Sequence, residues 1–180
     1  MRAAVTKRID ALRLRRHGPG MVIRDLRPAD LPAAERFVAE GLGGRRQARR
    51  GELIDVLDRP GLLAVDGEAI IGILTYDPGP SECELVALVA EPRRRGAGSA
   101  LVAELRARVP DRPIWLVTTN DNVDALRFYQ RRGFRLRALR PGAVDEARRT
   151  LKPAIPPTGD HGIPLRDEIE LLWSPDDPVR

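Results

Sequence analysis

The stretch from Glu82 to Val109 constrains the fold of this chain more than any other part of its sequence. It contains an apolar run, Leu85–Ala90, whose length and β-branched content predict a buried strand. A glutamate, a proline and three arginines follow, and then the turn Gly96-Ala97-Gly98. The next residues predict a helix, because Leu101 and Leu105 lie four apart on one helical face. The predicted order is therefore strand, basic glycine turn and helix.

This order predicts an anion site at the start of the helix. The first turn of a helix carries unpaired N–H groups and a partial positive charge. Glycines let a phosphate approach those groups closely, and arginines supply countercharge, so a pyrophosphate is the anion we expect. The sequence has no G-x-x-x-x-G-K-[ST], and Leu101 stands where G-x-G-x-x-G needs its third glycine. The alternative to an anion site is an ordinary arginine-rich turn before a helix.

A second strand and helix follow about thirty residues further along the chain. Ile114–Thr119 has the composition of a strand, and Asn120-Asp121-Asn122 offers side chains that cap a helix. The pattern predicts a helix over 123–132, which Gly133 would end.

Together the two segments resemble the signatures of the GNAT superfamily of N-acetyltransferases. RRRGAG at 93–98 matches [RQ]-x-x-G-x-[GA], the acetyl-CoA signature of that family. NVDALRFYQRRGF at 122–134 matches N-x-x-A-x-x-x-Y followed by G-F. Both occur in the family's order and spacing, and the resemblance extends over roughly residues 21–173. It implies acetyl-CoA as co-substrate and acetyl transfer to a small-molecule or protein amine.

The resemblance also implies how acetyl-CoA would bind. The glycine turn would wrap the pyrophosphate, and the end of the preceding strand would pair its backbone with the pantetheine arm. A bulge there would separate this strand from the Arg112–Thr119 strand, and the Val89 N–H would polarise the thioester carbonyl. Asn122 either bonds the cofactor or only caps its helix. The expected binding residues are Leu88, Val89, Ala90, Arg93, Arg94, Arg95, Gly96, Ala97, Gly98, Ser99, Ala100, Asn122 and Tyr129.

Acetyl transfer to an amine also needs an acid and a base. A free amine has a pKa near ~10 and must lose a proton, while the departing thiolate must gain one. Tyr129 falls on the family's general-acid position; the alternative is that it packs in the core, the role we assign to Phe128.

Glu84 is the preferred base, directly or through a water, because a carboxylate leading into a buried strand is costly unless it has a purpose. We expect Glu82, Glu84, Val86 and Leu88 to share one strand face. Glu84 could instead be exposed or paired with an arginine. Glu82 and Glu91 are weaker candidates, and we interpret Cys83 as a small buried apolar residue rather than a nucleophile.

Composition limits the other possibilities. Residues 1–20 hold six basic residues and one acid, whereas the remaining 160 hold 25 of each. We therefore expect a basic, flexible N-terminal arm, a neutral domain over 21–180 and no nucleic-acid partner, although RNA binding by the arm is an alternative. No apolar run reaches the ~18 residues of a membrane span, and the N-terminus lacks the apolar region of a secretory signal. The single cysteine favours the cytoplasm, and two distant histidines argue against a zinc site.

The predicted fold class is α/β: a mixed, mostly antiparallel, GNAT-like sheet of about seven strands with helices on both faces. Within it we predict a helix over 45–58 and a long loop, Lys152–Pro164, that covers the acceptor end of the site. The resemblance implies that a homodimer could form. The rival function is a GNAT-fold sensor or interaction module that binds acyl-CoA without catalysis.

Overall fold

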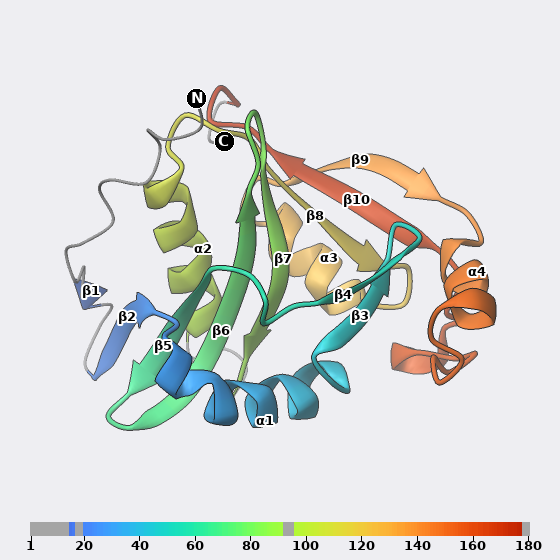
Figure 1. Cartoon of the computed structure of the whole chain (residues 1–180). Helices are drawn as coiled ribbons and strands as arrows, with labels where there is room; N and C mark the ends of the chain where they lie inside the picture. Colours follow the sequence, from blue (N-terminus) through green and yellow to red (C-terminus); the bar gives the residue numbers. More distant parts are fainter. Residues whose placement is uncertain (1–14, 17–19, 92–95, 178–180) are drawn as a thin grey trace, which may run out of the picture.

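The computed structural model describes residues 15–16, 20–91 and 96–177. Eight strands form one sheet in the order β1-β2-β5-β6-β7-β8-β10-β9, and β3 and β4 form a separate hairpin (Figure 1). The strands are β1 (Arg15–Arg16), β2 (Met21–Asp25), β3 (Arg46–Arg49), β4 (Glu52–Asp55), β5 (Gly61–Asp66), β6 (Ala69–Pro78), β7 (Cys83–Ala90), β8 (Ile114–Thr119), β9 (Arg135–Arg140) and β10 (Glu168–Trp173). The helices are η1 (Pro28–Asp30), α1 (Leu31–Leu42), α2 (Ala97–Arg108), α3 (Val123–Gln130), α4 (Ala143–Thr150) and η2 (Asp160–Gly162).

The sheet confirms the predicted fold class. Neighbouring strands pair antiparallel except β7 and β8, which are parallel. Apart from β1, which has two residues, the main sheet contains seven strands. A hairpin turn at Asp66-Gly67, a residue pair typical of such turns, joins β5 to β6, and Gly67 adopts the positive φ of 60° that the turn requires.

Two apolar clusters hold the helices on opposite faces of the sheet. On one face α2 buries Leu101 and Leu105 against Leu74 of β6, and this cluster extends to α3. On the other face α1 buries Ala34 and Val38 against Ile73 of β6. We call these the α2 face and the α1 face. Burying each amphipathic helix on its own face of the sheet is the layer arrangement expected of this fold class.

The prediction of a helix over 45–58 is wrong. This segment forms the β3–β4 hairpin, in which Arg49 pairs with Glu52 around a two-residue turn. Arg50 and Gly51 at the turn have positive φ values of 49° and 79°, the conformation that two-residue hairpin turns favour. Because side chains alternate along a strand, Ile54 of β4 lies inward, whereas its neighbour Leu53 is 41% exposed.

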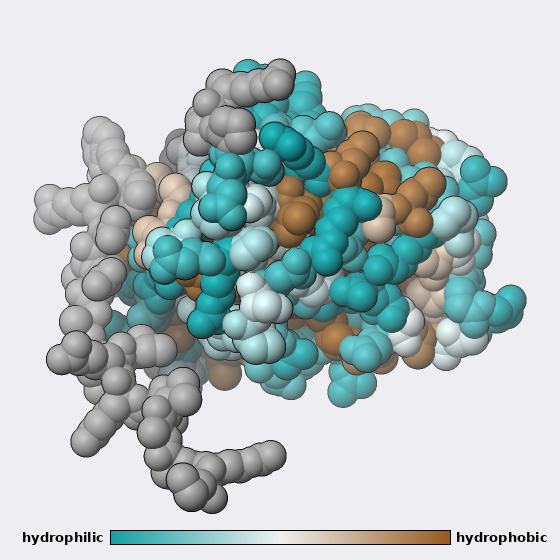
Figure 2. All heavy atoms as spheres, turned by 90° about the horizontal axis from the view of Figure 1, so that it is seen from above, coloured by the Kyte–Doolittle hydropathy of each residue, from teal (hydrophilic) through white to brown (hydrophobic). Residues whose placement is uncertain are grey.

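Most of the expected N-terminal arm lies outside the described residues, but Arg15–Arg16 pairs antiparallel with β2 at the sheet edge. The opposite edge is β9, where Leu136 and Leu139 are 61% and 59% exposed. Figure 2 shows apolar atoms at the surface on the side of the molecule where β9 lies. Among the described helices, none is long and apolar enough to cross a membrane.

Candidate active site

The parallel strands β7 and β8 form a fork. They pair only at Cys83–Ile114 and Glu84–Trp115. Beyond this point β8 continues to pair with β10, while the described part of the chain gives residues 85–90 no strand partner on the β8 side. The expected separation of these strands is therefore present, and it leaves a row of backbone groups that an extended ligand could pair with.

A β-bulge at Val86 lies just beyond the point where the fork opens. Thr75 of β6 pairs with Ala87 and Tyr76 with Leu85, so Val86 is the extra residue. We expected a bulge at the strand end, Leu88–Ala90, but it lies earlier, at Val86. It changes the alternation of side chains along β7. Val86 and Ala87 both join the cluster on the α1 face, and Leu88 packs on the α2 face. The prediction that Glu82, Glu84, Val86 and Leu88 share one face is therefore wrong for Leu88.

The glycine turn after β7 begins α2. Gly96 is the residue before the helix, with φ of 84°, and a Cβ added there would have no heavy atom of the described residues within 4 Å. Gly98 allows the Phe128 ring to pack closely, because a Cβ added at this position would lie 3.3 Å from the ring. The side chains of Ala97 and Ala100 are buried and so are not available for contact with a ligand. The predicted binding residues Arg93, Arg94 and Arg95 lie outside the described residues.

Arg132 joins the start of α2 to α3 and was not found from the sequence. Its guanidinium lies 3.5 Å from the centroid of the Phe128 ring, donates to the Phe128 carbonyl at 2.7 Å and contacts Ser99 Oγ. Phe128 therefore packs, as predicted, and the first turn of α2 is fixed against the helix that carries Tyr129.

Tyr129 of α3 lies in the apolar cluster on the α2 face, with 7% of its surface exposed. Its ring makes edge contacts with Phe128 and Phe134 at centroid distances of 5.1 and 5.3 Å. Burial raises the pKa of Tyr129 well above its ordinary value, because the phenolate would lose its hydration. The phenol is therefore protonated at neutral pH and can act as a proton donor. At the start of the helix Asn122 accepts from the Ala125 N–H at 3.1 Å and so acts as a cap.

Glu84 is buried on the α1 face at the base of the fork, with 7% exposure. It forms an ion pair with Arg49 of the β3–β4 hairpin, one of the arrangements considered from the sequence. Glu82 instead pairs with Arg137 of β9 at 3.0 Å. Cys83 points to the other side, into the α2-face core, where burial raises the pKa of its thiol to about 11. A thiol that stays protonated is a poor nucleophile at neutral pH.

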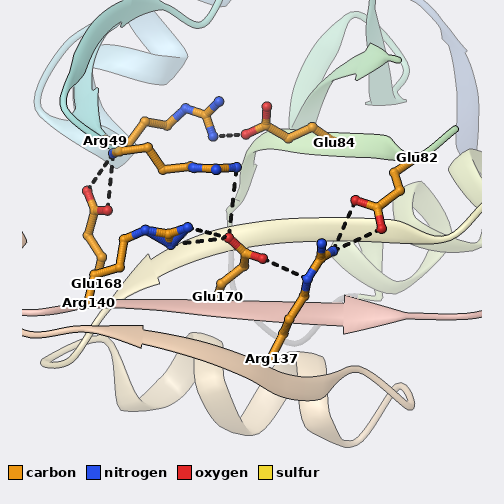
Figure 3. A network of polar contacts seen from close by, with 8 residues as sticks. Arg49, Glu82, Glu84, Arg137, Arg140, Glu168 and Glu170 are labelled. Carbon is orange, nitrogen blue, oxygen red and sulfur yellow. Dashed lines mark hydrogen bonds and ion pairs between the residues drawn. The ribbon is translucent and has the colours of Figure 1, made fainter. Parts of the chain in front are cut away.

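Glu84 belongs to a larger group of charges on the α1 face (Figure 3). Glu170, 4% exposed, forms an ion pair with Arg137 at 3.0 Å and accepts a hydrogen bond from Arg140 at 3.2 Å. Glu168, 2% exposed, accepts from the backbone N–H of Arg50 at 2.9 and 3.1 Å. This network could not be predicted from the sequence, because some of its partners, such as Arg50 and Glu168, lie more than a hundred residues apart.

The long loop at 152–164 packs against the junction of β8 and α3. Asp121, 6% exposed, accepts from the Asp160 N–H at 2.9 Å, and Asn120 donates to the Pro164 carbonyl at 2.8 Å. His161 Nε2 lies 4.0 Å from Asp124 Oδ2 on the first turn of α3. The loop is therefore fixed beside the open end of β8, and its role in covering an acceptor stays a prediction.

Comparison with known proteins gives the same family as the two sequence signatures. Residues 29–134 match the acetyltransferase (GNAT) family. Two uncharacterised Bacillus subtilis (strain 168) proteins are similar. YdhI is 42% identical over 118 residues, which are 64% of this chain and 72% of YdhI. YxbD is 41% identical over 121 residues, which are 66% of this chain and 75% of YxbD.

Solved structures share the fold. A GNAT family acetyltransferase from Elizabethkingia anophelis, crystallised with acetyl-CoA bound, aligns with a TM-score of 0.66 and 19% identity over 87% of this chain and 99% of that one. The Escherichia coli ribosomal-protein-S18-alanine N-acetyltransferase aligns with a TM-score of 0.63 and 17% identity, covering 89% and 97%.

Proposed function

The chain belongs to the GNAT family of acetyltransferases, and we propose that it moves an acetyl group from acetyl-CoA to a primary amine by direct attack. The observation that carries this proposal is the fork between β7 and β8, which opens next to the glycine turn at the start of α2. It offers a strand edge for an extended arm and a helix start for a phosphate within one site.

The residues present fit acetyl-CoA. The open space around Gly96 and the N–H groups of the first turn of α2 suit a pyrophosphate. The unpaired side of residues 85–90 suits the pantetheine arm. The Val89 N–H, the candidate from the sequence for polarising the carbonyl, faces β6 instead, because the Glu91 N–H donates to Ile71 and Val89, two residues earlier, pairs with Ile73 in the same register. The N–H groups on the fork side are those of Leu88 and Ala90, and one of these would polarise the carbonyl. Acetyl-CoA supplies the reactive thioester. The side chains of Ala97 and Ala100 are buried, so these residues would act through their backbone.

Two protons must move for the transfer to balance. As the amine nitrogen forms its bond to the acetyl carbon and the carbon–sulfur bond breaks, the nitrogen loses a proton and the sulfur gains one. Glu84 accepts the proton that leaves the nitrogen, directly or through a water, and Tyr129 donates the proton that the sulfur gains. The phenol of Tyr129 carries the proton that the second assignment needs, while the burial that raises its pKa also makes it a weaker acid. The ion pair between Glu84 and Arg49 must loosen for the first, because a paired carboxylate is a weaker base.

That ion pair also favours the second candidate function, an acyl-CoA-binding module without catalysis. If Arg49 never leaves Glu84, the fork could still hold acyl-CoA while lacking an available base. Turnover distinguishes the two: a module would bind acetyl-CoA in calorimetry and release CoA no faster with amines than without them.

The acceptor in this proposal is a small-molecule or protein amine. One structural neighbour is described as a ribosomal-protein-S18-alanine N-acetyltransferase, and another, Arabidopsis thaliana Naa50, was solved with a bisubstrate analogue, CoA-Ac-MVNAL. Their acceptors support an amine acceptor here without identifying it. We further propose that the protein acts in the cytoplasm, consistent with its single buried cysteine, and that a homodimer could form.

The test is a screen of primary amines and amino-terminal peptides with acetyl-CoA, read by mass spectrometry and by release of free CoA thiol. An acetylated amine, formed in proportion to enzyme, is the expected result. If acetyl-CoA binds but no amine in the screen gains an acetyl group, the catalytic proposal fails and the binding module stands.

A further inference from the structure

The β3–β4 hairpin places a positive charge of the chain itself at the base of the fork. The two-residue turn at Arg50-Gly51 directs Arg49 onto Glu84, the last β7 residue that still pairs with β8. Both arginines lie over the ring of Trp115, with guanidinium carbons 5.8 and 4.8 Å from its centroid. A guanidinium therefore occupies the point where β7 and β8 separate, on the α1 face (Figure 3).

The tip of this hairpin is held mainly by ionic contacts. Besides the Arg49–Glu84 pair, the Arg50 N–H donates to Glu168, and the Arg50 guanidinium lies 3.9 Å from Glu170. The Arg50 side chain is 42% exposed, and Leu53 beyond the turn is 41% exposed. The base of the hairpin is fixed differently, through Gln47, which donates to two backbone carbonyls, and through buried Ile54. The tip can thus be displaced while the base stays in place.

Arg49 is not in a favourable place for a cation. Burial lowers its pKa, and the adjacent positive charge of Arg50 lowers it further. Its Nε is buried without a hydrogen-bond partner. These features indicate that Arg49 can be replaced on Glu84 by another cation with better contacts.

A buried hydroxyl nearby also lacks a partner. Thr75 of β6 is 1% exposed, and its Oγ1 has no hydrogen-bond partner among the described residues. Asp77 pairs with Glu84, so Thr75, two residues earlier, is the diagonal neighbour of Glu84 on the same α1 face. A buried hydroxyl without a partner is rare, and a ligand N–H at the fork would satisfy it.

We propose that the acceptor is an alkyl diamine or polyamine whose ammonium group takes the place of the Arg49 guanidinium on Glu84. The inference rests on the acetyltransferase function proposed above. Removing the hairpin tip would free two buried carboxylates, Glu84 and Glu168, while Glu170 keeps Arg137 and Arg140. Two ammonium groups match that pair of charges. An ammonium group has three donors to share between Glu84 and Thr75, and the Trp115 ring supplies a further cation site.

The proposal is tested by calorimetry on the protein loaded with CoA, which allows acceptor binding without transfer. The titrants are 1,4-diaminobutane, 1-aminobutane and 4-aminobutanoate, which share a four-carbon chain and differ at one end. Arg49→Met removes the charge and keeps the stem over Trp115. Arg46→Ala is the control, because Arg46 lies on the same hairpin with an exposed side chain outside the network.

Wild-type protein should bind the diamine more tightly than the other two compounds, and Arg49→Met should tighten diamine binding by at least about tenfold. Arg46→Ala should leave it unchanged. Should Arg49→Met not fold, Glu168→Gln gives the second test, since it should remove the preference for the diamine over 1-aminobutane.

Two results would overturn the inference. Diamine binding that is not tightened by Arg49→Met would show that Arg49 does not occupy the acceptor position, and a diamine preference kept in Glu168→Gln would show that Glu168 does not bind the second ammonium group. Weaker 4-aminobutanoate binding in Arg49→Met would show instead that the arginine anchors an anionic acceptor. A wild-type protein that acetylates monoamines but not diamines would refute the inference alone, whereas failure to acetylate any amine would refute the proposed function.

Discussion

Tyr129 is the single residue on which the acid step of the proposed mechanism depends. Tyr129→Phe removes one hydroxyl and keeps the ring that packs against Phe128 and Phe134. We expect the turnover number to fall by about 10²-fold, the usual contribution of a positioned acid, while acetyl-CoA affinity changes little. Steady-state kinetics and calorimetry measure the two quantities.

Tyr76→Phe is the matched control, because Tyr76 is the other tyrosine of the chain and lies on β6 outside the proposed acid position. Full activity in Tyr129→Phe would mean that water protonates the thiolate and that the buried ring only packs. The cofactor assignment would not be affected by that outcome.

Glu84 allows a similar test of the base. Glu84→Gln keeps the shape of the side chain but cannot accept the amine proton, so the rate should fall and the acidic limb of the pH–rate profile should disappear. If Glu84 only balances the charge of Arg49, the substitution should lower the melting temperature and leave the acidic limb in place. Glu82→Gln is the control, because Glu82 pairs with an arginine at a more exposed position.

Among the elements, α2 carries the prediction about cofactor binding. Gly96 has a positive φ, so any substitution there strains the backbone, and a charge effect must be separated from that strain. Gly96→Asn and Gly96→Asp have nearly the same shape and both tolerate this conformation. If the turn holds a pyrophosphate, acetyl-CoA affinity measured by calorimetry should be at least about tenfold lower for Gly96→Asp than for Gly96→Asn. Equal affinities in two folded variants would contradict a phosphate at this turn.

The elements differ in how well the sequence predicted them. The strand, glycine turn and helix over 82–109 were predictable because hydrophobic period and turn residues agree there, and Leu101 and Leu105 are fully buried as expected. The β3–β4 hairpin was not, because an Arg-Gly pair lacks the asparagine or aspartate that usually signals a tight hairpin turn. The contacts that stabilise this turn come from β10, which lies far along the chain.

At the scale of the whole molecule, the sequence indicates the fold and the cofactor side of the site better than the acceptor side. The family signatures are contiguous, so 93–98 and 122–134 could be recognised without coordinates. The acceptor side proposed here draws on single side chains of β3, β7, β8 and β10, and Glu84, Glu168 and Trp115 come together only in the folded sheet. Pairings of this kind have no local pattern.

The stability of the molecule should depend on acid through Asp30, which connects β2 to the start of α1. Arg24 donates to both Asp30 oxygens at 2.6 and 2.7 Å, and these bonds lower the pKa of Asp30 although burial opposes them. Because the folded pKa lies below the unfolded one, this contribution is complete above the unfolded value of about 4 and is lost as the pH falls through the folded value. Asp30→Asn should therefore lower the free energy of unfolding at pH 7 and flatten its fall below pH ~4, as measured by urea unfolding. Asp58→Asn, at a side chain 68% exposed, is the control and should leave the acid dependence unchanged. An Asp30→Asn protein as acid-sensitive as the wild type would show that other carboxylates cause the acid dependence.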